Sequence, residues 1–249
     1  MSENQLNKVA AITFAFWVMK ICATTLGETA GDLLSMTLNI GYAASSLILI
    51  AIFLATLIGQ LTAKSYHPLL YWSVILSTST AGTTMSDYID RSLGMGYVAG
   101  SAMLLTLLLI ILAVWRANVG TLSVANVKSL KVESFYWAAI LVSNTLGTAL
   151  GDFLADSSGL GFAGGALLIA SLIVLIVLAY FFTSISRTML FWIAFVLTRP
   201  LGATVGDLLT KPLEKGGLGF GTIGSSAVLL AVLIVSIVIV SSRKKPAAA

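Results

Sequence analysis

The chain has 249 residues, of which 58% are hydrophobic and only 10% are charged, and its mean hydropathy is +1.00. Soluble domains carry about 25% charged residues, so this composition excludes a soluble globular protein and indicates an integral membrane protein. The net charge of +4 does not indicate nucleic-acid binding, because the basic residues lie at the ends of apolar runs. The single cysteine, Cys22, excludes a disulfide framework and a paired-cysteine metal site.

Four similar blocks follow one another along the chain and read TLGETAGDLL, TAGTTMSDYI, TLGTALGDFL and PLGATVGDLL. Each block contains an aspartate, at Asp32, Asp87, Asp152 and Asp207. A tryptophan lies 15 residues before each aspartate, at Trp17, Trp72, Trp137 and Trp192. Agreement at such fixed spacing indicates a four-fold internal repeat.

Each repeat contains two apolar segments, which predicts an all-α polytopic membrane protein with eight transmembrane helices. The expected spans are 9–33, 41–62, 68–88, 96–115, 134–154, 162–182, 188–209 and 219–241. Each is near the roughly 20 residues that cross a bilayer core. The expected organisation is an N-terminal segment 1–8, a first half 9–115, a polar linker 116–133, a second half 134–242 and a basic tail 243–249.

The basic residues gather on one side of the predicted spans, with nine there and three on the other side. The positive-inside rule then places both termini and the linker 116–133 in the cytoplasm, and the loops after the aspartates outside. Because each repeat is a two-span hairpin, all four repeats have the same orientation. We expect them to be related by a pseudo-symmetry axis along the membrane normal.

The first helix of each repeat carries a polar stripe at four-residue spacing. The stripes comprise Lys20, Thr24, Glu28 and Asp32; Ser79, Thr83, Asp87 and Arg91; Asn144, Thr148, Asp152 and Asp156; and Arg199, Ala203, Asp207 and Lys211. Residues spaced by four share one helical face, and lipid is a costly environment for charged side chains. We therefore expect a central ring of first helices with the stripes facing inward, surrounded by the plain second helices.

These stripes predict a central acidic cavity that binds a cation. The candidate binding residues are Glu28, Asp32, Asp87, Asp152, Asp156, Asp207, Thr24, Thr83, Asn144 and Thr148. An all-oxygen set favours Mg²⁺, Mn²⁺ or Ca²⁺, and the lack of inward-facing histidine or cysteine argues against Zn²⁺ and Cu⁺. No other cofactor is indicated.

Repeats one and three are the preferred metal-binding repeats, with Glu28, Asp32, Asp152 and Asp156 as candidate ligands. Acids four residues apart on one face repel each other, and repeat three carries no basic residue to relieve this repulsion. Lys20 and Arg199 are expected to compensate charge when the cation leaves.

Two alternatives stay open at this point. The aspartates are structural if they cap broken helices or pair with basic residues, namely Lys20, Arg199, Arg91 and Lys211. Arg91 and Lys211 lie four residues after Asp87 and Asp207, which is ion-pair spacing. The glycines before the aspartates either allow close helix packing or mark an unwound binding segment.

We interpret the chain as a transporter of a cation, with a divalent metal such as manganese as one candidate. The alternatives are a proton-coupled carrier of a small organic or neutral solute, and a membrane sensor or assembly protein. An enzyme is not expected, because the GxGD, Ser/His and HExxH patterns of membrane and metal hydrolases are absent from the sequence.

The four blocks and their tryptophans resemble the tandem DUF347 repeats of bacterial membrane proteins, over about residues 9–242. Repeat two departs from the TLGxxxGD phrase, since Ser86 replaces the second glycine. The resemblance implies two spans per repeat and a multi-pass protein of the bacterial inner membrane, with the lipid bilayer as partner. It implies no activity, and the oligomeric state stays open.

Overall fold

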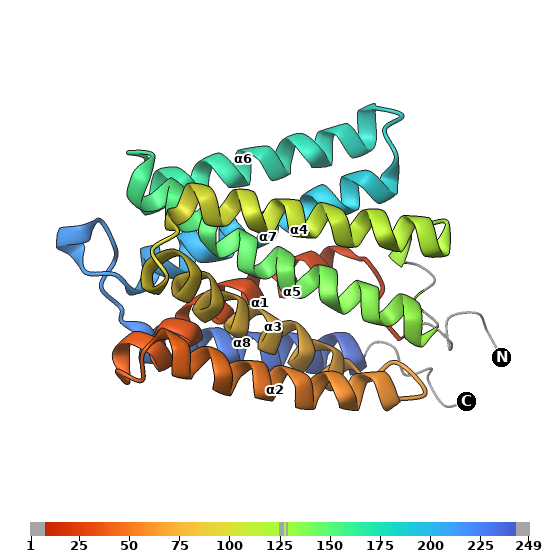
Figure 1. The fold of residues 1–249 in the computed structure, drawn as a ribbon, viewed down its shortest axis with the longest axis horizontal. Coiled ribbons are helices and arrows are strands. Elements are labelled where there is room, and N and C mark those ends of the chain that lie inside the picture. Colours follow the sequence, from red (N-terminus) through yellow and green to blue (C-terminus); the bar gives the residue numbers. More distant parts are fainter. Residues whose placement is uncertain (1–7, 125–126, 128, 243–249) are drawn as a thin grey trace.

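The computed structural model describes residues 8–124, 127 and 129–242, and these residues form a bundle of eight long α-helices (Figure 1). The helices are α1 (Phe14–Asp32), α2 (Tyr42–Thr62), α3 (Pro68–Asp87), α4 (Gly96–Val119), α5 (Leu130–Asp152), α6 (Gly161–Phe182), α7 (Arg187–Thr210) and α8 (Thr222–Ser242). α4 and α5 extend into the predicted linker. The predicted tail 243–249 and residues 1–7 of the predicted N-terminal segment lie outside the described residues.

Six of the eight helices are long and apolar enough to cross a membrane, namely α2, α4, α5, α6, α7 and α8. The other two, α1 and α3, are 19 and 20 residues long and carry much of the polar stripe. Because α1 and α3 are enclosed by their neighbours, their polar residues do not need to face lipid. The prediction of an all-α membrane protein with eight helices in four repeats is confirmed.

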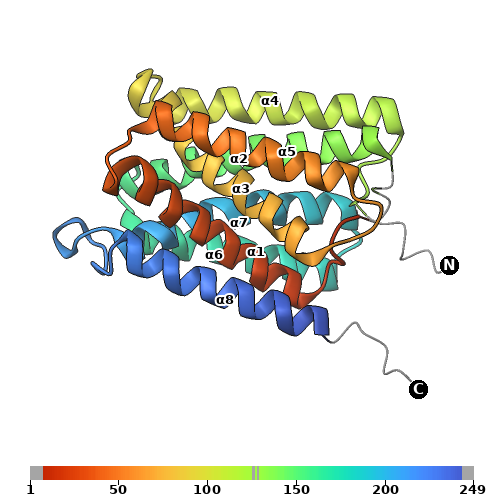
Figure 2. The ribbon, with the colours of Figure 1, turned by 90° about the horizontal axis from the view of Figure 1, so that it is seen from below.

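The first helices of the four repeats form a closed inner ring in which α1 packs on α3, α3 on α5, α5 on α7, and α7 on α1. They run in the same direction through the centre of the bundle (Figures 1 and 2). The predicted ring of first helices is therefore confirmed, whereas the orientation of its axis in the membrane stays a prediction.

Glycine allows close approach at each of the four junctions of the ring. An added Cβ atom on Gly31 would lie 2.8 Å from Thr83 Cβ, and one on Gly151 would lie 2.7 Å from Ala203 Cβ. The corresponding contacts at the other two junctions join Gly82 to Asn144 and Gly202 to Thr24. All of these glycines lie within continuous α-helix, so the packing alternative is the one that the structure supports.

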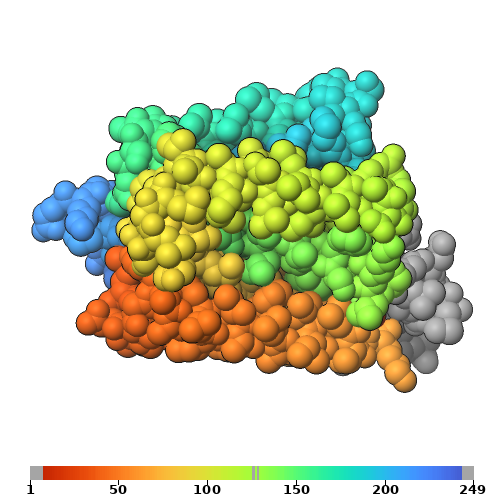
Figure 3. All heavy atoms as spheres, in the orientation of Figure 1, coloured from red at the N-terminus to blue at the C-terminus, as the bar shows by residue number. Residues whose placement is uncertain are grey.

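Each second helix packs on the first helix of the next repeat, with α2 on α3, α4 on α5, α6 on α7 and α8 on α1. The outer helices carry large exposed apolar side chains, including Leu47, Leu109, Leu175 and Val235. On the face drawn in Figure 3, α2, α4 and α6 cover most of the inner ring. This apolar exterior suits contact with lipid.

The path of the chain changes directly after three of the four repeat aspartates. Five-residue π-helical turns, Leu33–Thr37, Tyr88–Ser92 and Phe153–Ser157, follow Asp32, Asp87 and Asp152. In repeat four, α7 continues as α-helix to Thr210, and a short 3₁₀ turn, Leu213–Lys215, follows. The aspartates therefore mark one end of the inner ring, which we call the acidic end.

We predict that Gly202→Ala destabilises the protein by about 1–3 kcal/mol, because it overpacks the α7–α1 junction. The added Cβ would lie 2.5 Å from the Thr24 hydroxyl oxygen and 2.7 Å from the Thr24 carbonyl carbon. Thermal unfolding in detergent measures the effect. Gly224→Ala is the matched control, since no neighbouring atom lies within 4 Å of a Cβ added there. Equal melting temperatures for the two variants would contradict the role given to this junction.

Candidate cation-binding site

The stripe residues of the four inner helices lie in successive layers along the ring, because each step of four residues advances about 6 Å. The layer at the acidic end contains Asp32, Asp87, Asp152 and Asp207, all of them buried. The next layers are Glu28, Thr83, Thr148 and Ala203, then Thr24, Ser79, Asn144 and Arg199, and then Lys20, Ile75, Ile140 and Phe195. The positions of the charged residues differ between repeats, so the layers are chemically asymmetric.

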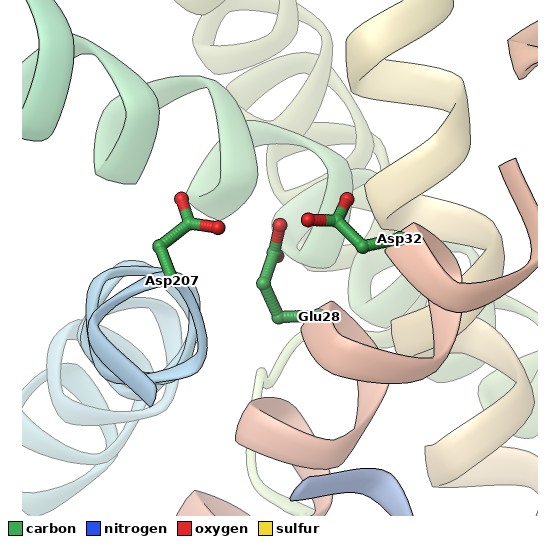
Figure 4. A group of neighbouring side chains, drawn as sticks. All are labelled: Glu28, Asp32 and Asp207. Atoms are coloured by element: carbon green, nitrogen blue, oxygen red, sulfur yellow. The ribbon is translucent and has the colours of Figure 1, made fainter. Parts of the chain in front are cut away.

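Three carboxylates from two neighbouring helices converge at the α1–α7 junction. Glu28 and Asp32 come from α1 and Asp207 comes from α7, and one oxygen of each lies within 4.8 Å of the others. Figure 4 shows the three side chains pointing toward one another. The approach depends on Gly206, where an added Cβ would lie 2.8 Å from Glu28 Cβ. We call Glu28, Asp32 and Asp207 the acidic triad.

Two basic side chains neutralise most of the charge of the acidic triad. Lys211 Nζ lies 2.6 Å from Asp32 Oδ2 and 3.0 Å from Asp207 Oδ1. Burial disfavours the charge on Lys211, but the carboxylates of Asp207 and Asp32 outweigh it and raise the pKa of Lys211 above its ordinary value. Arg199 Nη1 lies 3.0 Å from Glu28 Oε2. Lys211 is 20% exposed, whereas Arg199 is fully buried.

Arg199 ties three inner helices together beneath the acidic triad. Besides Glu28, its guanidinium donates to the carbonyl oxygens of Thr24 and Ser79, each at 3.2 Å, and to the hydroxyl of Thr83. Thr83 in turn donates to the carbonyl oxygen of Gly27. These contacts hold Arg199 from several sides, and its predicted role in charge compensation stays a prediction.

A second charged cluster lies at the α3–α5 junction around Arg91. Arg91 Nε lies 2.8 Å from Asp87 Oδ1, and Arg91 Nη2 lies 3.0 Å from Asp152 Oδ2 and 3.7 Å from Asp156 Oδ2. The Tyr97 hydroxyl donates to Asp156 Oδ2 at 2.9 Å, and Arg91 lies over the Tyr97 ring. We call this cluster the Arg91 clamp.

The Arg91 clamp corrects one sequence-based expectation. Asp152 and Asp156 were expected to lack a basic partner, which made them preferred metal ligands alongside Glu28 and Asp32. The expected lack of a partner is wrong, because ring closure brings Arg91 of repeat two against both carboxylates of repeat three. Their like-charge repulsion is therefore already relieved by a guanidinium.

The remaining predicted residues form hydrogen bonds within and between the inner helices. Thr24 Oγ1 donates to the carbonyl oxygen of Thr198 on α7, and Thr148 bonds only weakly to the carbonyl oxygen of Asn144 on its own helix, at 3.5 Å. Asn144 donates to Thr78 Oγ1 and accepts from Lys20 Nζ, so its amide is occupied within the ring and we do not count it as a cation ligand.

Sequence reasoning missed an aromatic layer at the opposite end of the ring. An aromatic residue directly precedes each repeat tryptophan, and it contacts the tryptophan of the next repeat at all four junctions. The pairs are Phe16–Trp72, Tyr71–Trp137, Tyr136–Trp192 and Phe191–Trp17, with ring centroids 5.6–6.5 Å apart. The hydroxyls of Tyr71 and Tyr136 are 2.7 Å apart. The aromatic residue that directly precedes each repeat tryptophan is the sequence pattern that could have predicted this layer.

A second missed feature is the fully buried Glu133, which falls in the predicted linker. Its carboxylate binds Lys8 Nζ at 3.0 Å and accepts from Gln60 Nε2 at 3.1 Å. Lys8 also donates to the carbonyl oxygen of Leu61. This ion pair joins the segment before α1 to α5 beyond the aromatic layer.

These observations define a helical membrane protein built from four repeats around a buried charged centre. The family model described as Repeat of Unknown Function (DUF347) matches four times, at residues 15–66, 70–121, 135–186 and 190–245. The chain therefore belongs to the DUF347 family, as the sequence resemblance predicted. No curated protein and no solved structure matches the chain.

We predict that Arg91→Ala lowers the free energy of unfolding by about 3 kcal/mol, because it leaves Asp87 and Asp152 buried without a counter-charge. Thermal and denaturant unfolding in detergent measure the loss. Arg187→Ala is the control, since the exposed Arg187 lies over the ring of Tyr180 and forms no ion pair with another described residue. We expect a change below about 1 kcal/mol. A similar loss in both variants would show that the Arg91 clamp has no special structural role.

Proposed function

We propose that the protein is a transporter that carries a cation through the inner ring, with the acidic triad as its binding site. The observation that carries this proposal is the convergence of three buried carboxylates within 4.8 Å of one another. A carboxylate inside a membrane is costly, and such residues commonly mark ion pathways. Positive-inside reasoning further supports an inner-membrane location with both termini in the cytoplasm.

The chemistry of the acidic triad favours a hard divalent cation. Carboxylate and hydroxyl oxygens are the ligands that Mg²⁺, Mn²⁺ and Ca²⁺ prefer. When all groups are ionised, Arg199 and Lys211 leave the three carboxylates with one surplus negative charge. If Lys211 withdraws, the surplus becomes two, which a divalent cation neutralises. Manganese is one candidate within this class.

Lys211 has the properties of a tethered counter-ion that the substrate replaces. It lies just beyond the end of α7, is partly exposed, and has a flexible stem with a compact ammonium group. Its Nζ contacts the same two aspartates that an incoming cation needs. We infer that the cation displaces Lys211 on binding and that Lys211 returns to Asp32 and Asp207 when the cation leaves.

The two ends of the ring favour a carrier over an open pore. At the acidic end, Lys211 and Arg91 are 20% and 33% exposed, so the site is accessible to small ions after a side-chain movement. At the opposite end, Tyr71 and Tyr136 are buried and bonded to each other within the aromatic layer. We infer that the described conformation receives its cation from the acidic end and that release requires the aromatic layer to open.

We predict that Glu28→Gln, Asp32→Asn and Asp207→Asn each weaken divalent-cation binding at least about tenfold, since each removes one charged ligand. Binding is measured by titration of purified protein with Mn²⁺, Mg²⁺ and Ca²⁺, and transport is measured as ion flux into proteoliposomes. Glu214→Gln is the matched control, because Glu214 is an exposed acid near the same end. Absence of binding and flux for every ion with the wild type would overturn the proposal.

The tethered counter-ion leads to a separate prediction for Lys211→Met. Removing the competing ammonium group is expected to raise cation affinity at least about threefold and to slow release, so that flux falls while binding improves. Lys215→Met, which removes an exposed lysine four residues later, is the control. Weaker binding in Lys211→Met than in wild type would contradict competition between Lys211 and the cation.

A further inference from the structure

Lys20 is a fully buried lysine that lies between the aromatic layer and the acidic triad. Its Nζ donates to Asn144 Oδ1 at 3.4 Å and lies 4.2 Å from the centre of the Phe195 ring. Ion pairs among the described residues involve Lys8, Arg91, Arg199 and Lys211, and none of them includes Lys20. Lys20 therefore lacks the carboxylate partner that the other buried cations have.

The surroundings of Lys20 are poor in compensating charge on every side. The equivalent positions of the other three repeats hold Ile75, Ile140 and Phe195, all fully buried. The charged and titratable residues of the neighbouring inner helices are Tyr71 and Asp87 on α3, Lys131, Glu133, Tyr136 and Asp152 on α5, and Arg187, Arg199 and Asp207 on α7. Glu28, Asp32 and Cys22 share α1 with Lys20, and α8 carries no titratable side chain between Thr222 and Ser242.

The basic residue in the adjacent layer of the ring has the same sign as Lys20. Arg199, one layer nearer the acidic end, repels the Lys20 ammonium group. The nearest acid in sequence, Glu28, lies two helical turns away and is already paired with Arg199. An unpaired ammonium ion in such a site costs free energy that a neutral amine does not.

We propose that Lys20 is a proton-binding site whose protonation is coupled to cation binding at the acidic triad. The proposal rests on the proposed function and adds the coupling ion to it. A cation at the triad would place two further positive charges about 12 Å from Lys20, as judged from eight residues of helix. The proton then leaves Lys20 Nζ for solvent, the amine becomes neutral, and the cation is exchanged for a proton.

The coupling works in both directions, because linkage between two sites is reciprocal. Protonated Lys20 weakens cation binding, and neutral Lys20 permits it, so affinity rises with pH as Lys20 loses its proton. At an effective dielectric constant of about 20, a unit charge about 12 Å from a divalent ion changes affinity by roughly 100-fold. Since screening reduces this figure, we expect at least about a tenfold difference between the two protonation states of Lys20.

Two substitutions imitate the neutral and the charged states of the Lys20 side chain. Lys20→Met removes the charge and retains the length, so its cation affinity at pH 6 should approach that of wild type at high pH. Lys20→Arg retains the charge throughout, so its affinity should stay low up to pH 9. The titrations use Mn²⁺ and Mg²⁺ with the purified full chain, and an indicator dye in weak buffer counts the protons released. Wild type should release about one more proton per bound cation than Lys20→Met.

The controls separate this proposal from the proposed function. Glu28→Gln tests the acidic triad, and Lys64→Met tests removal of an exposed lysine. Deprotonation of the carboxylates raises cation affinity with pH in every variant, so the decisive quantity is the difference between wild type and Lys20→Met. If wild type binds no cation, both proposals fail. Binding by wild type but not by Glu28→Gln supports the acidic triad. If Lys20→Met then keeps the pH dependence and the proton release of wild type, only the proton site at Lys20 is overturned.

Thermal melting and size-exclusion chromatography without cation distinguish misfolding of a variant from a specific loss of cation binding. Lys20→Met should melt at or above the wild-type temperature, because it replaces an unpaired buried amine with an apolar side chain of similar length. If Lys20→Met is not folded, Lys20→Gln serves for the same measurements. A melting temperature of folded Lys20→Met well below wild type would show that the Lys20 ammonium group is structural and would overturn the proposal.

Discussion

Buried charged side chains in this bundle find their counter-charges on neighbouring helices, and this pairing sets how the inner helices can pack. Glu28 of α1 requires Arg199 of α7, and Asp152 of α5 requires Arg91 at the end of α3. These pairs reach ion-pair distance only because glycines let the inner helices approach closely, as Gly206 does beside Glu28. Glycine packing and ion pairing therefore act at the same junctions of the ring.

The acidic triad with Lys211 and the Arg91 clamp occupy equivalent junctions of the four-repeat ring, but their basic residues differ in chemistry. Lys211 and Arg91 each pair with the aspartate four residues earlier and with the aspartate of the following repeat. Arg91 holds two carboxylates through different nitrogens of a planar, permanently charged group, whereas Lys211 is a compact charge on a flexible stem. The third carboxylate of the triad, Glu28, corresponds to Thr148 in repeat three. The Arg91 clamp thus suits a fixed structural role, and the acidic triad suits exchange of its counter-ion.

The sequence predicted the fold well because its strongest signals are periodic. Tryptophan and aspartate at fixed spacing identified four repeats, and polar residues at four-residue spacing identified the inner helices and their ring. Spacing within one helix revealed Asp87–Arg91 and Asp207–Lys211, which are confirmed. It could not reveal Asp32–Lys211, since 179 residues separate the partners and their contact depends on how the ring closes.

The same limitation explains why the carboxylates of repeat three were predicted to lack a basic partner. A stripe without basic residues looks uncompensated when each helix is considered alone, but a neighbouring helix supplies Arg91. Glycine spacing was equally ambiguous, because both packing and unwinding use small residues near a charge. The choice between them required the positions of the opposing side chains, such as Thr83 against Gly31. The buried position of Glu133 was not predicted because the polar sequence around it resembles a linker.

Under the proposed function, the order of the layers along the ring limits how a cation crosses it. A cation at the acidic triad has Arg199 and then Lys20 ahead of it, followed by the closed aromatic layer around Tyr71. Arg199 on α7 is bonded to α1 and α3, so its guanidinium lies in a fixed position on this path. Lys20 is the one cation on this path whose charge can be removed without breaking an ion pair among the described residues. Under the proposed function, passage toward the aromatic layer is electrostatically easiest when Lys20 is neutral, so the proposed coupling requires Lys20 to lose its proton before the cation passes it.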